Sequence, residues 1–211
     1  MPVRILIVDD HSVVRRGLIS ILREHLPEVE FGEAGNSREG FAAVLADRWN
    51  LVVVDVSMPG RNGLDLIRDI KREHPELPVL VVSAHAEKDY AVRALKLGAA
   101  GYVSKQSAAD VLVTAVHHVL SGGRYVSPAL AEMMAGLLAG GGPETSHECL
   151  SNRELQVLKM IASGKTVKEI SADLALSEKT VATYRARISE KMGLPTNVDL
   201  ARYAMRHGLV E

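Results

Sequence analysis

Side chains able to hold a divalent cation and take up a phosphoryl group follow the apolar runs in the first half of the chain. Asp9 and Asp10 come after the first run, Asp55 after the third, Ser83 after the fourth and Lys105 after the fifth. Clustered carboxylates repel one another unless a cation joins them, and oxygen ligands suit Mg²⁺. An aspartate can attack phosphorus and form an acyl phosphate. Asp55 is therefore the predicted phosphoryl acceptor, with Mg²⁺, Lys105 and Ser83 neutralising the phosphoryl oxygens.

The elements that would position these side chains alternate along the first 120 residues. Apolar runs cover residues 3–8, 29–34, 51–54, 79–82 and 100–103, and stretches of helical period cover residues 12–26, 37–47, 63–74, 87–97 and 107–120. A continuous apolar run indicates a strand buried on both faces, and the alternation indicates a parallel sheet covered by helices on both sides. Because parallel strands end at the same edge, the polar residues are expected to meet at one rim.

This pattern resembles the receiver domain of two-component response regulators. The resemblance covers residues 3–121 and includes Asp-x-x-Met-Pro-x-x-x-Gly at 55–63 and Ser-Ala at 83–84. It implies a flavodoxin-like, doubly wound five-stranded parallel sheet, with a histidine kinase as the phosphodonor. It also implies that Mg²⁺ is held by Asp9, Asp10, Asp55 and the Ser57 backbone carbonyl, that Lys105 pairs with the phosphate, and that Ser83 and the aromatic Tyr102 change position on phosphorylation.

The second half shows helical periodicity only. Ser151 and Glu154 open it with a capping box, and helices are expected over residues 151–162, 166–174, 177–192 and 196–207. Two short helices, a tight turn and a longer third helix form a helix-turn-helix, whose third helix is the candidate reader of the DNA major groove. The middle of that helix is basic, and its expected buried face consists of Val181, Tyr184, Ile188 and Met192.

The second half resembles the LuxR-type (NarL/FixJ family) DNA-binding domain, through Leu-Ser-Asn-Arg-Glu-Leu-Gln-Val-Leu at 150–158 and Leu-Ser-Glu-Lys-Thr-Val at 176–181. The resemblance implies an all-α, four-helix domain. It places base contacts at Ala182, Thr183 and Ala186, with Arg185 as a further hydrogen-bond donor. The expected phosphate contacts are Thr166, Lys168, Lys179, Thr180, Arg187 and Lys191. The expected dimer contacts are Val198, Ala201, Tyr203 and Ala204.

The expected organisation is a receiver domain at 1–121, a linker with a short helix at 122–147, and the DNA-binding domain at 148–211. The single cysteine, Cys149, excludes an internal disulfide framework and fits a reducing cytoplasm. Apolar runs are shorter than the roughly 18 residues of a membrane helix, so a soluble cytoplasmic protein with no membrane partner is predicted.

The leading hypothesis is a phosphorylation-switched transcription regulator whose partners are a histidine kinase, double-stranded DNA and a second copy of the chain; contact with RNA polymerase is left open. Its only chemistry would be phosphorylation by small acyl phosphates and loss of its own phosphoryl group. A phosphatase that forms an aspartyl phosphate is disfavoured, because it needs an aspartate where Ser57 stands. An adaptor whose helix-turn-helix does not bind DNA is the third hypothesis, kept open by the small residues at 182, 183 and 186.

Overall fold

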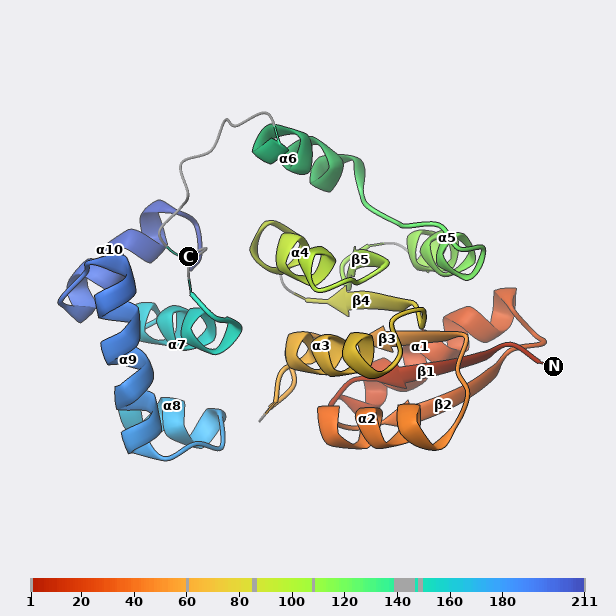
Figure 1. The fold of residues 1–211 in the computed structure, drawn as a ribbon, viewed down its shortest axis with the longest axis horizontal. Helices are drawn as coiled ribbons and strands as arrows, with labels where there is room; N and C mark the ends of the chain where they lie inside the picture. Colours follow the sequence, from red (N-terminus) through yellow and green to blue (C-terminus); the bar gives the residue numbers. More distant parts are fainter. Residues whose placement is uncertain are drawn as a thin grey trace. The chain divides into compact units, whose positions relative to one another are not determined.

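The chain divides into two compact units, residues 1–139 and 140–211 (Figure 1). The computed structural model describes residues 2–59, 61–84, 87–107, 109–138, 147 and 150–210, except for the side chains of 87–89 and 136–138. The glycine-rich stretch expected to separate the domains lies outside the described residues apart from His147, and Cys149 lies outside them as well.

Strands and helices alternate in the first unit, as the sequence predicts. Its elements are β1 (Arg4–Val8), α1 (Ser12–His25), β2 (Glu30–Ala34), α2 (Ser37–Ala46), β3 (Leu51–Val54), α3 (Gly63–Glu73), β4 (Val79–Ser83), α4 (Glu87–Lys96), β5 (Gly101–Ser104), α5 (Ala109–Leu120) and α6 (Pro128–Leu138). The helix ends follow local chemistry: Asn36 and Asn62 cap α2 and α3 by accepting backbone N–H groups with their side chains.

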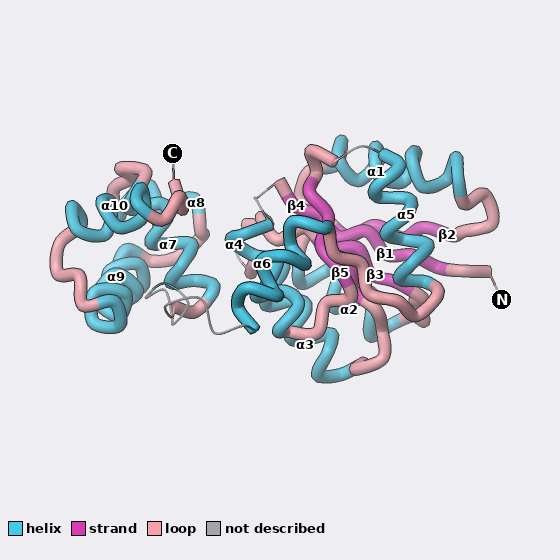
Figure 2. Tube along the Cα trace, turned by 90° about the horizontal axis from the view of Figure 1, so that it is seen from above, coloured by secondary structure: helices cyan, strands magenta, loops and turns pink. Residues whose placement is uncertain are grey.

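The five strands form one parallel sheet in the order β2-β1-β3-β4-β5. This is the doubly wound order in which the chain changes direction between β1 and β3, beside which ligands bind. Val8 lies opposite Val54, so Asp9 and Asp55 leave neighbouring strands at the same level. Helices α1 and α5 pack on one face (Figure 2), where Leu22 and Val116 join the apolar side chains of the strands. The predicted five-stranded fold is confirmed.

The segment after α5 extends the first unit along the edge strand β5. The Tyr125 amide donates to the Ala100 carbonyl at 2.8 Å, and the Tyr102 amide donates to the Tyr125 carbonyl at 3.4 Å. Helix α6 then packs against α4, and Leu130 is completely buried. The predicted linker helix therefore docks within its own chain.

The second unit consists of α7 (Asn152–Ala162), α8 (Val167–Asp173), α9 (Glu178–Met192) and α10 (Asn197–Arg206). Capping boxes open α7 and α8, and α9 ends at Gly193, whose φ of 65° is left-handed. Helix α7 packs against α8, α9 and α10 around a core that includes Leu158, Ile170 and Ile188. The predicted four-helix domain is confirmed.

Candidate functional site

Asp55 lies at the carboxyl end of β3 and is almost completely buried. Its amide donates to the Val8 carbonyl at 2.8 Å, which ties the end of β3 to β1. The chain enters α3 at Gly63, where an added Cβ would lie 2.0 Å from the Asp55 carbonyl oxygen. Only glycine fits at this position, because the obstacle is backbone. The buried Ser37 hydroxyl, at the start of α2, donates to the Arg61 carbonyl at 2.6 Å and so holds the segment just before α3.

Asp9 and Asp10 follow β1 and are fixed from α1. The His11 amide donates to Asp9 Oδ1 at 2.7 Å, and the His11 ring Nδ1 lies 3.0 Å from Asp10 Oδ1. Arg15 donates from Nη1 to the Asp9 backbone carbonyl at 2.7 Å. These contacts hold the acidic pair beside Asp55.

Lys105 connects the ends of the two central strands. Its Nζ lies 2.6 Å from Asp9 Oδ2 and 2.9 Å from Asp55 Oδ2. Burial alone would lower the pKa of Lys105, but the hydrogen bonds and charges of the two aspartates outweigh burial and keep the pKa above its ordinary value. The ammonium therefore stays charged and neutralises part of the acidic cluster.

The expected switch residues, Ser83 and Tyr102, are both completely buried. Ser83 ends β4, and its carbonyl accepts the Lys105 amide at 2.8 Å, so the hydroxyl-bearing residue and the ammonium-bearing residue leave adjacent strands together. Tyr102 lies on β5 with its ring inside the unit. Ser57 follows Asp55 by two residues, and its side-chain oxygen is buried with no hydrogen-bond partner among the described residues. The metal-binding role of its carbonyl stays a prediction.

The acidic rim fits a divalent cation. One possible ligand atom from each of Asp9, Asp10, His11 and Asp55 lies within 4.8 Å of the others. Lys105 takes Oδ2 of Asp55, whereas Oδ1 is buried and accepts no hydrogen bond from the described part of the chain. A buried carboxylate oxygen without a partner is unfavourable, and hard cations such as Mg²⁺ bind such oxygens.

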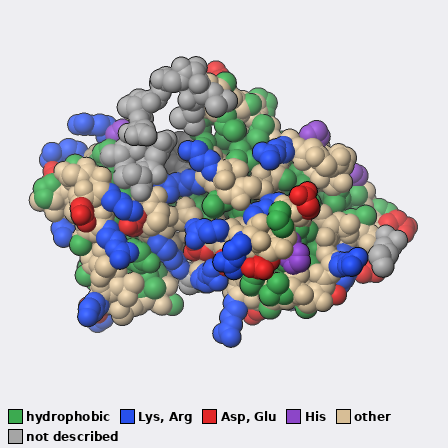
Figure 3. All heavy atoms as spheres, in the orientation of Figure 1, with side chains coloured by type: hydrophobic (Ala, Val, Ile, Leu, Met, Phe, Trp, Pro, Cys, Tyr) green, Lys and Arg blue, Asp and Glu red, His purple; other side chains and the backbone are tan. Residues whose placement is uncertain are grey.

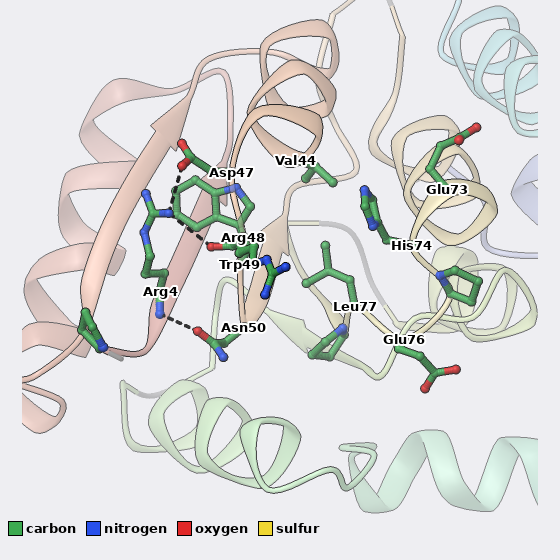
Figure 4. Close-up of a pocket in the computed structure, with 13 residues that line it drawn as sticks. Arg4, Val44, Asp47, Arg48, Trp49, Asn50, Glu73, His74, Glu76 and Leu77 are labelled. Atoms are coloured by element: carbon green, nitrogen blue, oxygen red, sulfur yellow. Dashed lines mark hydrogen bonds and ion pairs between the residues drawn. The ribbon is translucent and has the colours of Figure 1, made fainter.

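A hollow of about 960 Å³ lies at the opposite, amino-terminal edge of the sheet (Figure 4). Trp49 forms part of its wall, with Nε1 donating to the Ala43 carbonyl at 2.9 Å and the Arg4 guanidinium 4.5 Å from the ring centroid. Trp49 precedes β3 and Asp55 follows it, so this hollow is separate from the acidic rim. Trp49 is the only tryptophan in the chain and reports on the first unit.

The exposed surface of α9 carries the small and basic residues that sequence analysis selected. Val181, Ile188 and Met192 are buried, whereas Tyr184 is only half-buried. Tyr184 lines a shallow cleft of about 310 Å³ together with Lys179, Thr180, Thr183 and Arg187. Lys and Arg side chains project from this unit in Figure 3. The assignment of Tyr184 to the buried face was therefore only half correct, since its ring also borders the candidate DNA surface.

Several of the predicted DNA contacts have partners within the chain. Arg185 donates from Nε to Asn197 Oδ1 at 2.8 Å and from Nη2 to the Pro195 carbonyl. Lys191 Nζ lies 2.7 Å from the buried Glu154 carboxylate. The remaining members are exposed or half-exposed: Thr166, Lys168, Lys179, Thr180, Ala182, Thr183, Ala186 and Arg187. Among them, Thr180 hydrogen-bonds to Ser177 and Thr183 donates to the Lys179 carbonyl. The side chain of Thr166 also takes part in the capping box of α8.

Helix α10 exposes a narrow apolar stripe. Val198 is 65% exposed and Met205 is 56% exposed. Of the predicted dimer contacts, Ala201 and Tyr203 keep part of their surface, but Ala204 is completely buried in the core of its own unit. Met205 was not selected from the sequence, although its place seven residues after Val198 on one helix face was the available signal.

Sequence reasoning placed His11 near the phosphorylation site but missed two further partners that fix the predicted groups, Arg15 and Ser37. His11 and Arg15 hold Asp9 and Asp10, and Ser37 holds the loop after Asp55. The position of His11 directly after two aspartates was enough to place it beside the acidic pair. The Ser37 contact had no signal in the sequence, because it joins the start of α2 to a loop residue 24 positions further along the chain.

Together, the two units define a class of protein: an α/β unit with a buried aspartate in an acidic rim, joined to a helix-turn-helix unit. The model of the response regulator receiver domain matches residues 5–117, and that of the bacterial regulatory proteins of the luxR family matches residues 148–204. The chain belongs to the two-component response regulators that join a receiver domain to a LuxR-type DNA-binding domain. This family regulates transcription and is not a family of classical enzymes.

Relatives match over nearly the whole chain. Response regulator GacA of Pseudomonas viridiflava is 37% identical over 212 residues, covering 99% of this chain and 98% of the relative. Response regulator UvrY of Escherichia coli (strain K12) is 37% identical over 210 residues, covering 98% and 95%. RcsB of Salmonella enterica serovar Typhimurium, solved on promoter rprA with the phosphomimetic BeF3-, is 28% identical with a TM-score of 0.66, covering 96% and 98%.

Within the described residues, no helix combines the length and the apolar character needed to cross a membrane.

Proposed function

We propose that Asp55 accepts a phosphoryl group from a histidine kinase and that this event controls DNA binding by the second unit. The observation that carries the proposal is the state of the Asp55 carboxylate. It is buried, Lys105 holds Oδ2, and Oδ1 has no hydrogen-bond partner among the described residues. An oriented carboxylate with one oxygen available and a cation beside the other is suited to nucleophilic attack on phosphorus.

The transfer would form one bond and break one bond. Asp55 Oδ1 attacks the phosphorus of a phosphohistidine, the new O–P bond forms as the N–P bond breaks, and the leaving imidazole nitrogen keeps the electron pair. Lys105 turns its ammonium from the carboxylate to the phosphoryl oxygens. Mg²⁺, held by Asp9, Asp10, Asp55 and the Ser57 carbonyl, would neutralise developing charge on the same oxygens.

The phosphoryl group adds about −1.5 to −2 charge at the end of β3. In this proposal the Ser83 hydroxyl moves towards it and the Tyr102 ring changes rotamer. Both residues are buried and lie on the adjacent strands β4 and β5. A change in the packing of β5 would alter the surface formed by α4, β5 and α5, which is the part of the receiver that responds.

The second unit would bind double-stranded DNA through α9. The exposed Ala182, Thr183 and Ala186 permit close approach to base edges, with methyl contacts to thymine. The Thr183 hydroxyl donates to the Lys179 carbonyl at 2.9 Å, so its oxygen would accept a hydrogen bond from a base. Lys179 and Arg187 line the cleft beside them and suit phosphate contacts, which position the helix without reading sequence. Solved promoter complexes of the similar protein RcsB support this assignment.

The proposal includes a homodimer, in which α10 contributes Val198, Ala201 and the exposed part of Tyr203. It assigns the receiver to residues 1–121, the linker to 122–147 and the DNA-binding domain to 148–211. Contact with RNA polymerase is left open. A regulator of this kind acts on chromosomal DNA, so we place it in the cytoplasm.

The test is phosphoryl labelling of the full chain with acetyl phosphate and Mg²⁺, followed by selection of genomic DNA fragments. The variant Asp55→Asn should lose both labelling and the phosphorylation-dependent gain in DNA affinity. The matched control is Asp47→Asn, the same chemical change at an exposed position on the opposite edge of the sheet. Full labelling of Asp55→Asn would refute the acceptor site.

A second candidate function, that of a protein-binding adaptor, is favoured by the small exposed residues of α9, Ala182, Thr183 and Ala186. An adaptor that uses its second unit for protein contact would carry phosphate at Asp55 but would select no DNA fragment. Steady turnover of a phosphomonoester would instead support the phosphatase hypothesis, which is disfavoured because Ser57 occupies the position of the required aspartate.

A further inference from the structure

The ring of His11 is directed at the acidic rim instead of capping its helix. His11 is the N-cap residue of α1, but its side chain makes no capping hydrogen bond. Its Nδ1 lies 3.0 Å from Asp10 Oδ1 and 3.4 Å from Asp9 Oδ1. The backbone N–H of the same residue donates to Asp9 Oδ1 at 2.7 Å. The turn after β1 therefore brings an imidazole nitrogen against both carboxylates of the pair.

The distances suit a single ion. A donor atom from each of Asp9, Asp10, His11 and Asp55 lies within 4.8 Å of the other three. Metal–ligand bonds of about 2.0–2.6 Å place opposite ligands roughly 4–5 Å apart, so one ion can reach all four.

The ammonium group of Lys105 occupies a different part of the acidic rim. Lys105 contacts Oδ2 of Asp9 and Oδ2 of Asp55, whereas Oδ1 of Asp55 is buried and has no hydrogen-bond partner in the described residues. Of the two oxygens of Asp9, Oδ1 is the one turned to His11. The ammonium therefore leaves Oδ1 of both aspartates for an added ion, and Asp9 Oδ1 lies 3.4 Å from the His11 imidazole nitrogen.

We propose that His11 is a metal ligand in this pocket and gives it a preference for divalent transition metals over Mg²⁺. Mg²⁺ takes oxygen ligands, whereas imidazole suits later first-row transition ions, for which affinity rises from Co²⁺ through Ni²⁺ to Cu²⁺ and falls again at Zn²⁺. The inference rests on the proposed function, because it uses Asp9, Asp10 and Asp55. It adds a nitrogen donor and a second class of metal ion to the expected set of oxygen ligands.

The preference would have a consequence for phosphorylation. A transition metal held partly by nitrogen would compete with Mg²⁺ for the same carboxylates. The pocket would then be sensitive to the kind of divalent cation available as well as to the phosphodonor.

The test compares metal binding by the full chain and by His11→Gln. The side chain of His11 is 65% exposed, so this substitution leaves the core intact. Titration calorimetry with Co²⁺, Zn²⁺ or Mg²⁺ alone measures affinity, and ¹⁵N spectra of the imidazoles during Zn²⁺ addition show directly whether the ring coordinates. The matched control is His25→Gln, at the other end of α1, whose ring contacts the Ile21 carbonyl.

Co²⁺ and Zn²⁺ affinity should fall about 10–100-fold in His11→Gln and stay unchanged in His25→Gln, while Mg²⁺ affinity changes little. The Nδ1 resonance of His11 should shift on Zn²⁺ binding. Equal Co²⁺ affinity in wild type and His11→Gln, or an unshifted ring, would overturn the inference and leave the phosphorylation pocket standing. If Asp55→Asn also left every metal affinity unchanged, the expected Mg²⁺ site of the proposed function would fail with it.

Discussion

Replacing Lys105 by methionine should destabilise the receiver and make its stability depend on Mg²⁺. The ammonium lies 2.6 Å from Asp9 and 2.9 Å from Asp55, and the three side chains are 17%, 2% and 1% exposed. Methionine would leave two buried carboxylates facing each other without a counter-charge. Removing one member of a buried ion pair costs about 3–5 kcal/mol. We expect about 3 kcal/mol, because Asp9 keeps the hydrogen bond from the His11 amide.

The assay is urea unfolding of the full chain at pH 7, followed by the fluorescence of Trp49, which belongs to the receiver. Added Mg²⁺ should recover much of the loss in Lys105→Met, since an ion at 100 times its dissociation constant contributes about 2.7 kcal/mol. Wild type should gain less, because the ammonium already neutralises part of the negative charge that the ion would balance. Lys96→Met, the same change at an exposed position of α4, is the control.

The pH dependence has a definite sign. The pKa of Lys105 is raised above 10.5 in the folded chain, so the ion pairs contribute fully below that pH and are lost as pH rises through the folded pKa. The difference in unfolding free energy between wild type and Lys105→Met should be constant from pH 7 to 10 and should shrink at higher pH. A difference below about 0.5 kcal/mol at pH 7, or equal stabilisation of both proteins by Mg²⁺, would refute the reasoning.

Three further predictions follow from single contacts. Gly63→Ala puts a Cβ 2.0 Å from the Asp55 carbonyl oxygen and should cost about 1–3 kcal/mol of receiver stability. Urea unfolding followed by Trp49 fluorescence measures this loss, and phosphoryl labelling should be weaker. Unchanged stability and labelling would contradict the steric argument. Glu154→Gln should cost about 1–3 kcal/mol and speed hydrogen exchange in α7 and α9. Burial would raise the pKa of Glu154, but its hydrogen bonds hold that pKa below 4.5. The carboxylate therefore stabilises the fold above pH 4.5, and this stabilisation is lost as pH falls. Equal acid sensitivity of Glu154→Gln and wild type would count against this prediction. Arg187→Ala should lower the salt dependence of DNA binding by about one unit of slope, and an unaltered slope would remove Arg187 from the phosphate contacts.

The strands and the acidic rim could be predicted because each depends on local sequence and one topological rule. Runs such as Leu51–Val54 are apolar at every position, which a strand buried on both faces requires. Polar residues that follow such strands must then meet at the carboxyl edge. Asp9 lies beside Asp55 because β1 and β3 are parallel neighbours in which Val8 is opposite Val54.

The partners of individual side chains could not be predicted in the same way. Lys191 and Glu154 are 37 residues apart, and their ion pair depends on how α9 crosses α7. Arg185 likewise turns to Asn197 only because α10 starts beside the end of α9. Charge and spacing on one helix identify a basic surface, but the packing of its neighbours decides which cations remain available for DNA.

The linker shows why backbone contacts are harder still to predict from sequence. β5 is the edge of the sheet, and an edge strand offers N–H and C=O groups to any extended segment. Tyr125 uses its own backbone to bridge Ala100 and Tyr102, so the pairing leaves little trace in side-chain pattern. The sequence feature that fits this pairing is Gly101, because a Cβ there would lie 2.6 Å from the Tyr125 carbonyl oxygen. Because the same strand carries Tyr102, the segment that leads towards the second unit is hydrogen-bonded to the residue expected to respond to phosphorylation.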